Sequence, residues 1–236
     1  MGGNMRCGAL CGSVARALGW ITGTILVTFA SAVAADPYNF DSDAYLGEAR
    51  LMPEWANTLK RQSTEDEILS ACLLDSDTCP NKYRGVRHLL VKAQSLTKER
   101  QIKLVNHYVN NRRYRRDRTA HLVTPLSDEP VKYRSRWATV NDFLTRGGDC
   151  EDFATTKYFL LRRLGVEAQQ MRVVVAYDRQ ARGYHAVLAV LRDNGKIWLL
   201  DSDGYVRSSG RNPYRYIYAV NELSIWDHET KKEIAS

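Results

Sequence analysis

The sequence predicts an α+β protein in which N-terminal helices pack on an antiparallel sheet. Residues 98–111 and 150–164 carry apolar side chains at helical spacing. Residues 171–177, 185–191 and 197–200 are instead rich in β-branched and apolar residues, as strands are. The helical segments come first along the chain and the strands follow, which is the order of an α+β protein.

The first 35 residues predict a signal peptide. Arg6 and Arg16 give the segment a basic start, and residues 17–30 form an apolar stretch as long as the core of a signal sequence. The Ala-Val-Ala tripeptide that ends at Ala34 offers a cleavage site there or one residue later. An uncleaved membrane anchor is the alternative, but the apolar stretch is shorter than the ~20 residues that a spanning helix needs.

Residues 36–236 would remain after export, a length that suits one domain with a substantial core. The formal charge of the whole chain is +7, and loss of the signal segment would remove two of its arginines. The densest basic stretch is Arg-Arg-Tyr-Arg-Arg-Asp-Arg at 112–118. An exported protein rarely meets nucleic acid. We therefore expect no nucleic-acid partner, and favour a solvated face or a dock for an acidic partner or a membrane surface.

The cysteines single out one thiol. Cys7 and Cys11 lie in the signal segment, and Cys72 and Cys79 are close neighbours that an oxidising compartment could join. Cys150 is then left over. An odd cysteine in an exported protein is either a free reactive thiol or half of an intermolecular bridge.

The N-terminal half is predicted to be helical. Residues 36–98 have a helical pattern with breaks, and no strand is expected there. The run Ser-Thr-Glu-Asp-Glu at 63–67 looks like a helix start, because acidic residues favour the first turn. In the helix expected over 98–111, Asn106 and Asn110 stand four apart on a face beside the apolar stripe.

The second half begins with a loop that changes the organisation of the chain. Residues 117–135 are polar, contain two prolines and are predicted to form a long loop. Gly147-Gly148-Asp149 then interrupts the chain just before the helix expected over 150–164, and Gly165 provides its C-terminal stop. Lys157 falls within the apolar stripe of that helix. Strands are expected at 171–177, 185–191, 197–200 and 214–220.

Cys150 occupies the position that a nucleophilic thiol needs. A free thiol has a pKa near 8.5 and is only ~3% ionised at pH 7, so a catalytic site must lower that pKa. A helix N-terminus favours negative charge on the sulfur, and the amide of the same residue can donate to a developing oxyanion. Gly147 and Gly148 would let the backbone and a substrate approach closely.

His185 and Asp201 can meet only if the hairpin between their strands has the right length. A two-residue loop would place Asp201 on the opposite face of the sheet from His185. A three-residue loop, 193–195, with Gly195 in a left-handed conformation, would put Asp201 and Asp203 on the face of His185. We therefore predict the three-residue loop.

Each of these residues also has a structural interpretation. A helical cysteine is usually inert core, a strand histidine is usually structural, and Asp201–Gly204 could be a simple turn. The same four residues resemble the opening of a calcium loop, but Tyr205 and Asn212 do not fit that motif. The order Cys, His, Asp, with the last two on strands, makes a catalytic triad as plausible as these alternatives.

Longer motifs point to a family. The run from Trp137 to Tyr158 contains Gly-Asp-Cys-Glu-Asp, and His-Ala-Val-Leu follows at 185–188. These motifs resemble those of the bacterial transglutaminase-like cysteine proteinases of the LapG type. Supporting matches, which extend the resemblance over about residues 50–205, are Val105-Asn106, Val109-Asn110, Leu200-Asp201 and the Cys72/Cys79 pair. One departure is Ser202, where the family usually has asparagine, so Asp201 and Asp203 both stay open as the partner of His185.

The resemblance implies a papain-like fold and a periplasmic endopeptidase that trims a large surface adhesin near its N-terminus. It also implies calcium dependence, with Asp149 and Glu151 as ligands and Asp152 as a third candidate. Acidic residues in a first helical turn also stabilise the helix dipole without any metal. Members of the family are often held by an inner-membrane receptor that responds to a cyclic dinucleotide.

The predicted reaction is hydrolytic acyl transfer. His185 takes the proton of Cys150, the thiolate attacks a peptide carbonyl, and Asp201 holds the imidazole tautomer. The second oxyanion donor is expected to be Asn106 or Trp137. Two rival functions remain, namely acyl transfer to an amine, as in a transglutaminase or amidase, and a non-catalytic periplasmic binding module.

Overall fold

The computed structural model of the chain describes residues 37–41, 44–116, 136–210 and 212–228. The predicted signal peptide at 1–35 and the predicted loop at 117–135 lie outside the described residues. None of the described helices combines the length and apolar character required to cross a bilayer. These helices are α1 (Pro53–Leu74), α2 (Asn81–Gln94), α3 (Lys98–Asn110), α4 (Val140–Arg146) and α5 (Cys150–Arg163).

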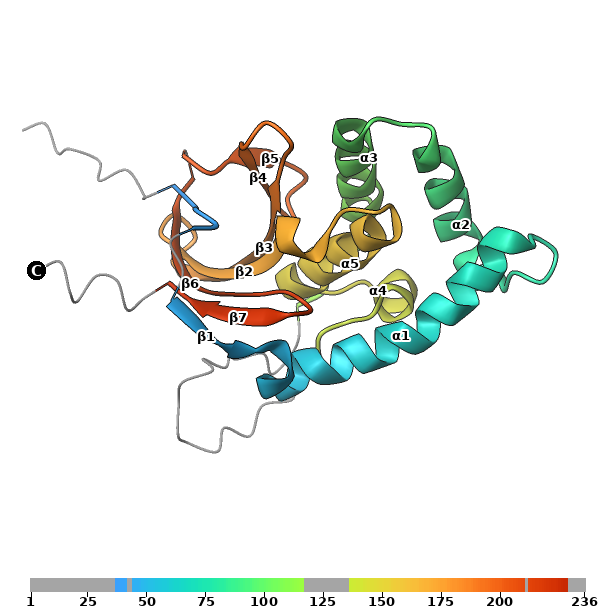
Figure 1. Cartoon of the computed structure of the whole chain (residues 1–236), viewed down its shortest axis with the longest axis horizontal. Helices are drawn as coiled ribbons and strands as arrows, with labels where there is room; N and C mark the ends of the chain where they lie inside the picture. Colours follow the sequence, from blue (N-terminus) through green and yellow to red (C-terminus); the bar gives the residue numbers. More distant parts are fainter. Residues whose placement is uncertain (1–36, 42–43, 117–135, 211, 229–236) are drawn as a thin grey trace, which may run out of the picture. The chain divides into compact units, whose positions relative to one another are not determined.

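The strands form a seven-stranded antiparallel sheet in the order β1-β7-β6-β2-β3-β4-β5 (Figure 1). The predicted α+β class, with N-terminal helices packed on an antiparallel sheet, is therefore confirmed. The strands are β1 (Ala44–Glu48), β2 (Met171–Asp178), β3 (Gly183–Leu191), β4 (Ile197–Leu200), β5 (Val206–Ser208), β6 (Tyr214–Val220) and β7 (Ser224–Asp227).

The sheet has an apolar core on each face because its central strands are buried on both sides. Leu188 and Val190 on β3 belong to the larger core, which they share with the helices. Val187, the neighbour of Leu188, belongs to the core on the opposite face. There it packs with Tyr38 and Phe40, from a short N-terminal segment that lies within the curve of the sheet (Figure 1).

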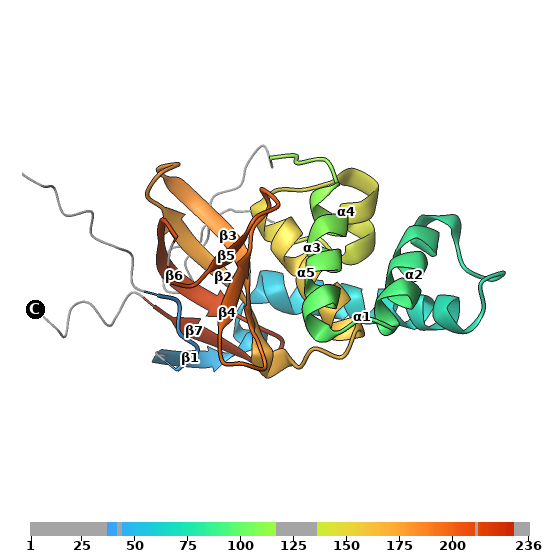
Figure 2. The same cartoon turned by 90° about the horizontal axis from the view of Figure 1, so that it is seen from above.

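α5 is the buried helix of the fold. It contacts β2 and β3 on one side and α3 and α4 on the other (Figure 2). Its side chains from Asp152 to Leu161 are all buried. The predicted helix over 150–164 is confirmed to within one residue, and Gly165 follows it with φ of 84°, a conformation that glycine adopts readily.

The hairpin between β3 and β4 has the predicted three-residue loop. Leu191 pairs with Ile197 and Leu188 with Leu200, and this register places positions 185 and 203 opposite each other. The amide of Arg192 donates to the carbonyl of Lys196 at 2.9 Å, and Gly195 has φ of 74°. The register prediction, on which the meeting of His185 and Asp201 depends, is confirmed.

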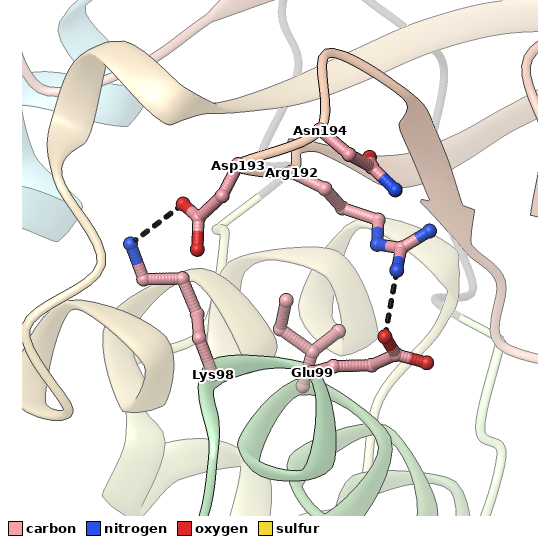
Figure 3. A pocket seen from close by; sticks show the side chains of 6 residues that line it. Lys98, Glu99, Arg192, Asp193 and Asn194 are labelled. Atoms are coloured by element: carbon pink, nitrogen blue, oxygen red, sulfur yellow. Dashed lines mark hydrogen bonds and ion pairs between the residues drawn. The ribbon is translucent and has the colours of Figure 1, made fainter.

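Two ion pairs attach this hairpin to the start of α3. Lys98 pairs with Asp193 at 3.2 Å, and Glu99 pairs with Arg192 at 2.6 Å (Figure 3). These residues line a pocket of about 190 Å³ together with Ile102 and Asn194. Because the charged side chains that line it are already paired with one another, the pocket is best explained as a structural contact that keeps the hairpin in place.

Two predictions for the N-terminal half were wrong. β1 lies where no strand was expected, since it is short and is defined by its pairing with β7 rather than by its own pattern. The run 63–67 lies inside α1, which begins at Pro53. Its Glu65 accepts hydrogen bonds from the Thr139 hydroxyl at 2.5 Å and the Asn141 amide at 2.9 Å. This acidic residue therefore serves the N-terminus of α4, a different helix.

A disulfide joins Cys72, at the end of α1, to Cys79, just before α2. Both residues are buried among the side chains of the larger core. Cys150 is the free cysteine among the described residues. The pairing that an oxidising compartment would favour is thus present, and the odd thiol is the one at the start of α5.

Candidate active site

Cys150 is the first residue of α5, with Asp149 at the N-cap position. It is buried, with 8% of its surface exposed. The backbone amide of Ala186 donates toward the sulfur, so the thiol lies beside the residue that follows His185 on β3. The thiol also donates to Glu151 Oε2 at 3.3 Å. The helix N-terminus and the start of β3 therefore meet at the sulfur.

The two glycines before Cys150 are required by close contacts. Gly147 has φ of 71°, and a Cβ there would lie 2.1 Å from the carbonyl oxygen of Arg113. A Cβ at Gly148 would lie 2.1 Å from Asp152 Oδ2. The loop can pack against both neighbours only because neither glycine has a side chain.

His185 and Asp201 are in contact. His185 Nε2 lies 2.7 Å from Asp201 Oδ1. With Asp201 ionised, Nε2 is the donor of this bond and carries the ring proton, which leaves the lone pair of Nδ1 for another partner. Asp203, the other aspartate on this face, binds Arg207 and accepts from the Tyr205 amide at 2.9 Å. The carboxylate that contacts the imidazole is therefore that of Asp201.

Asp201 is held in its ionised form. It is only 2% exposed, and burial by itself would raise its pKa. The hydrogen bond and charge of His185 oppose that effect, as do the hydroxyl of Tyr214 and the guanidinium of Arg207, whose Nη1 lies 3.0 Å from Oδ2. The net result is a pKa for Asp201 well below its usual range.

Three side chains that were not predicted to play this role hold the loop that follows β4. Lys157 on α5 donates to the Asp201 carbonyl at 2.7 Å, and Asn110 on α3 donates to the same oxygen at 3.1 Å. Asn106 donates to the Gly204 carbonyl at 3.1 Å. The amide of Asn106, a candidate oxyanion donor, is thus engaged with this loop. The other candidate, Trp137, is buried with its ring 5.5 Å from that of Trp55.

The surroundings of the thiol oppose its ionisation. Burial raises the pKa of Cys150 well above its usual value, and the negative charges of Glu151 and Asp149 raise it further. The Ala186 amide lowers this pKa, but its contribution is smaller. The effect of the helix N-terminus on the sulfur is therefore opposed by burial and by these two carboxylates.

The acidic residues around Cys150 crowd one another. Burial, followed by the charge of Asp149, raises the pKa of Glu151 to about 8. Asp152 directs Oδ1 at the Ala138 amide, 2.7 Å away. Across the described part of the chain, no three His, Cys, Asp or Glu side chains are already grouped as metal ligands. The donor atoms are nonetheless hard carboxylate oxygens of the kind that calcium prefers.

Comparison with known protein families decides the class of protein. The family of bacterial transglutaminase-like cysteine proteinases matches residues 69–228, a span that includes Cys150, His185 and Asp201. The chain belongs to this family. The family resemblance inferred from the Gly-Asp-Cys-Glu-Asp motif is thereby confirmed, and the chain is a transglutaminase-like cysteine peptidase by membership.

Solved structures with the same fold include those of LapG from Legionella pneumophila. The calcium-bound form is 26% identical over 62% of this chain and 77% of that chain, with a TM-score of 0.51. The EGTA-treated form is 25% identical over 70% and 86%, with a TM-score of 0.54. A third LapG structure, 24% identical over 71% and 91% with a TM-score of 0.53, supports the fold alone. A comparison with curated protein sequences found no match.

Proposed function

We propose that this chain is a calcium-dependent cysteine endopeptidase of the periplasm that uses Cys150 as nucleophile, His185 as base and Asp201 to orient the imidazole. The observation that carries the proposal is the 2.7 Å contact between His185 and Asp201, one residue from the amide that faces the Cys150 sulfur. A thiol, an imidazole and an orienting carboxylate are the three parts that this chemistry requires.

The reaction proceeds in two acyl-transfer steps. Nδ1 of His185 takes the thiol proton, the sulfur attacks the peptide carbonyl carbon, and the Cys150 amide donates to the oxyanion. The imidazolium returns its proton to the leaving amine, and a thioester remains on Cys150. Nδ1 then takes a proton from water, whose oxygen attacks the thioester and releases the carboxylic acid with the free thiol. Asp201 stabilises the imidazolium in both steps.

Calcium fits the donor chemistry of Asp149 and Glu151, with Asp152 as a third candidate. The raised pKa of Glu151 indicates that two buried carboxylates lie close enough to repel each other. A bound divalent cation would supply positive charge that offsets this repulsion and reduces the opposition of both carboxylates to the thiolate. The LapG structures obtained with calcium and after EGTA treatment support the choice of this ion.

The proposed substrate is a large surface adhesin, cut near its N-terminus, and the proposed regulator is an inner-membrane receptor that responds to a cyclic dinucleotide. Both are inferred from the resemblance of this chain to other members of its family. Export to the periplasm is supported by the predicted signal peptide and by the Cys72–Cys79 disulfide, which an oxidising compartment favours.

The test compares the intact enzyme with Cys150→Ala on secreted surface proteins, with and without a calcium chelator. The intact enzyme is expected to shorten one large surface protein, and Cys150→Ala and the chelated enzyme are expected to leave it whole. His185→Ala should abolish alkylation of Cys150 by iodoacetamide at neutral pH, whereas His88→Ala, which changes an exposed histidine on α2, should not. Incorporation of a labelled amine without cleavage would overturn hydrolysis in favour of transglutamination.

A further inference from the structure

The basic stretch that the sequence left unexplained lies against the loop that carries the nucleophile. The arginine segment, defined here as Arg112–Arg116, leaves the end of α3 beside the connection from α4 to α5 (Figure 2). Tyr114 forms a parallel bridge with Gly148, and the Arg115 amide donates to the Gly148 carbonyl at 2.7 Å. The segment is therefore attached two residues before Cys150.

The guanidinium groups of this segment have no acidic partner among the residues that the structure describes. All of its residues are exposed. Arg112 donates to the hydroxyl of Tyr108 at 2.9 Å, and Arg115 donates to the carbonyl of Arg146 at 3.2 Å, so both bonds go to neutral oxygens. Arg113 and Arg116 form no ion pair within the described ranges. The segment thus presents four positive charges that no described carboxylate pairs with.

Tyr114 packs the arginine segment against the helix that begins at Cys150. Tyr114 is 48% exposed, and its ring stacks on that of Phe153 of α5, with the ring centroids 5.9 Å apart. Phe153 is on the first turn of the helix that Cys150 begins. The ring and the arginines on either side of it are therefore attached to the same helical turn as the thiol and to the loop before it, within reach of a polypeptide bound at the sulfur.

We propose that the arginine segment binds acidic side chains of the polypeptide substrate next to the bond that is cut. Guanidinium groups form strong, charge-assisted hydrogen bonds with carboxylates. A polypeptide is favoured over a membrane because the segment is joined to the nucleophile loop, where a bilayer would cover the approach to Cys150. This inference rests on the proposed function, since it assigns a class of sequence to the same site.

The test measures binding separately from cleavage. A short fluorescein-labelled oligoglutamate peptide is titrated with Cys150→Ala protein, and fluorescence anisotropy reports the dissociation constant over a range of salt concentrations. The double variant Arg113→Gln/Arg116→Gln is expected to bind about tenfold more weakly and with a smaller salt dependence. The matched control is Arg84→Gln/Arg100→Gln, which removes two exposed arginines from α2 and α3. It is expected to bind as the parent does.

The outcomes distinguish the two proposals. Equal peptide affinity for the two double variants, at unchanged unfolding midpoints, would overturn the arginine-segment inference and leave the proposed peptidase untouched. Binding of phosphatidylserine vesicles that depends on Arg113 and Arg116, without a matching effect on the peptide, would overturn it in favour of a membrane surface. If the intact enzyme cuts no surface protein, the proposed function is overturned. A loss of peptide binding confined to Arg113→Gln/Arg116→Gln would then still support the binding of acidic peptides by the arginine segment.

Discussion

Lys157 is a buried amine. We expect its removal to stabilise the protein and to lower the reactivity of Cys150. Its side chain has no exposed surface, and Nζ donates to a backbone carbonyl rather than to a carboxylate. Burial lowers the pKa of Lys157 from 10.5 to about 7, although the charges of Asp201 and Asp203 oppose this effect. Between those two values the unfolded chain holds one more proton than the folded protein, so this residue makes stability rise with pH.

The size of the effect follows from the shift. A difference of about 3.5 pKa units corresponds to roughly 5 kcal/mol of destabilisation below pH 7, relative to a side chain that does not titrate. Lys157→Met keeps a side chain of similar length and loses one hydrogen bond worth about 1 kcal/mol. The Asp201 carbonyl retains its bond from Asn110 at 3.1 Å, so no acceptor is orphaned. We expect Lys157→Met to raise the free energy of unfolding at pH 7 by about 2 to 4 kcal/mol.

The assay is urea unfolding, followed by tryptophan fluorescence, at several pH values between about 7 and 10. The difference between Lys157→Met and the parent should be largest at pH 7 and shrink as the pH rises. The alkylation rate of Cys150 should fall by about tenfold, because Asp201 loses one of its two carbonyl tethers. Lys60→Met, which changes an exposed lysine on α1, is the control and should show neither effect. A stability difference that is independent of pH, or a less stable Lys157→Met protein, would refute this reasoning.

Three further perturbations test other parts of the structure. Replacing Cys72 and Cys79 together with alanine should lower the free energy of unfolding by about 2.5 kcal/mol, because their disulfide closes a short loop between positions 7 residues apart in the sequence. In urea unfolding, a reductant should have no further effect on this double variant. In the same assay, Gly147→Ala should lower the free energy of unfolding by at least about 1 to 2 kcal/mol, because φ is 71° and a Cβ would meet the Arg113 carbonyl. Gly210→Ala is the control and should leave this free energy nearly unchanged, because the space around Gly210 is open. Asp201→Asn should reduce peptidase activity about 10²-fold or more, because an amide cannot stabilise the imidazolium; wild-type rates in that variant would contradict the proposed role. Because the pKa of Asp201 is lowered on folding, its contribution to stability is present above about pH 4 and lost as the pH falls, and Asp201→Asn should lack that loss in acid unfolding.

Periodicity within single elements was enough to predict α5 and the strands β2, β3, β4 and β6, but it did not predict α4, β5 or β7. The apolar stripe of α5 and the apolar runs of β2, β3 and β4 are local properties, so their positions were correct to within a residue or two. β1 was missed because its pairing with β7, far along the chain, is what makes it a strand. The helix start expected at 63–67 was misplaced for a similar reason, since the carboxylate of Glu65 caps a helix from another part of the chain.

The polar side chains that hold the loop after β4 could be noticed in the sequence, but their hydrogen-bond partners could not be predicted from it. Asn106 and Asn110 stood out by their spacing, and Lys157 was a charged residue in an apolar stripe. Their partners are the backbone carbonyls of Asp201 and Gly204, which lie 91 and 98 residues away from the asparagines that bind them. A backbone carbonyl has no signature in a sequence, so only the packing of α3 and α5 against this loop could reveal the contacts.

By itself, the sequence determined the family, the odd thiol and the odd-length hairpin that puts Asp201 on the face of His185. These depend on motif, cysteine count and the two-residue repeat of a strand, all of which are local. The tertiary structure decided which aspartate contacts the imidazole, and that burial is the largest cause of the raised pKa of Cys150. Burial and charge are sums over neighbours from distant segments, and they exist only once the chain has brought those segments together.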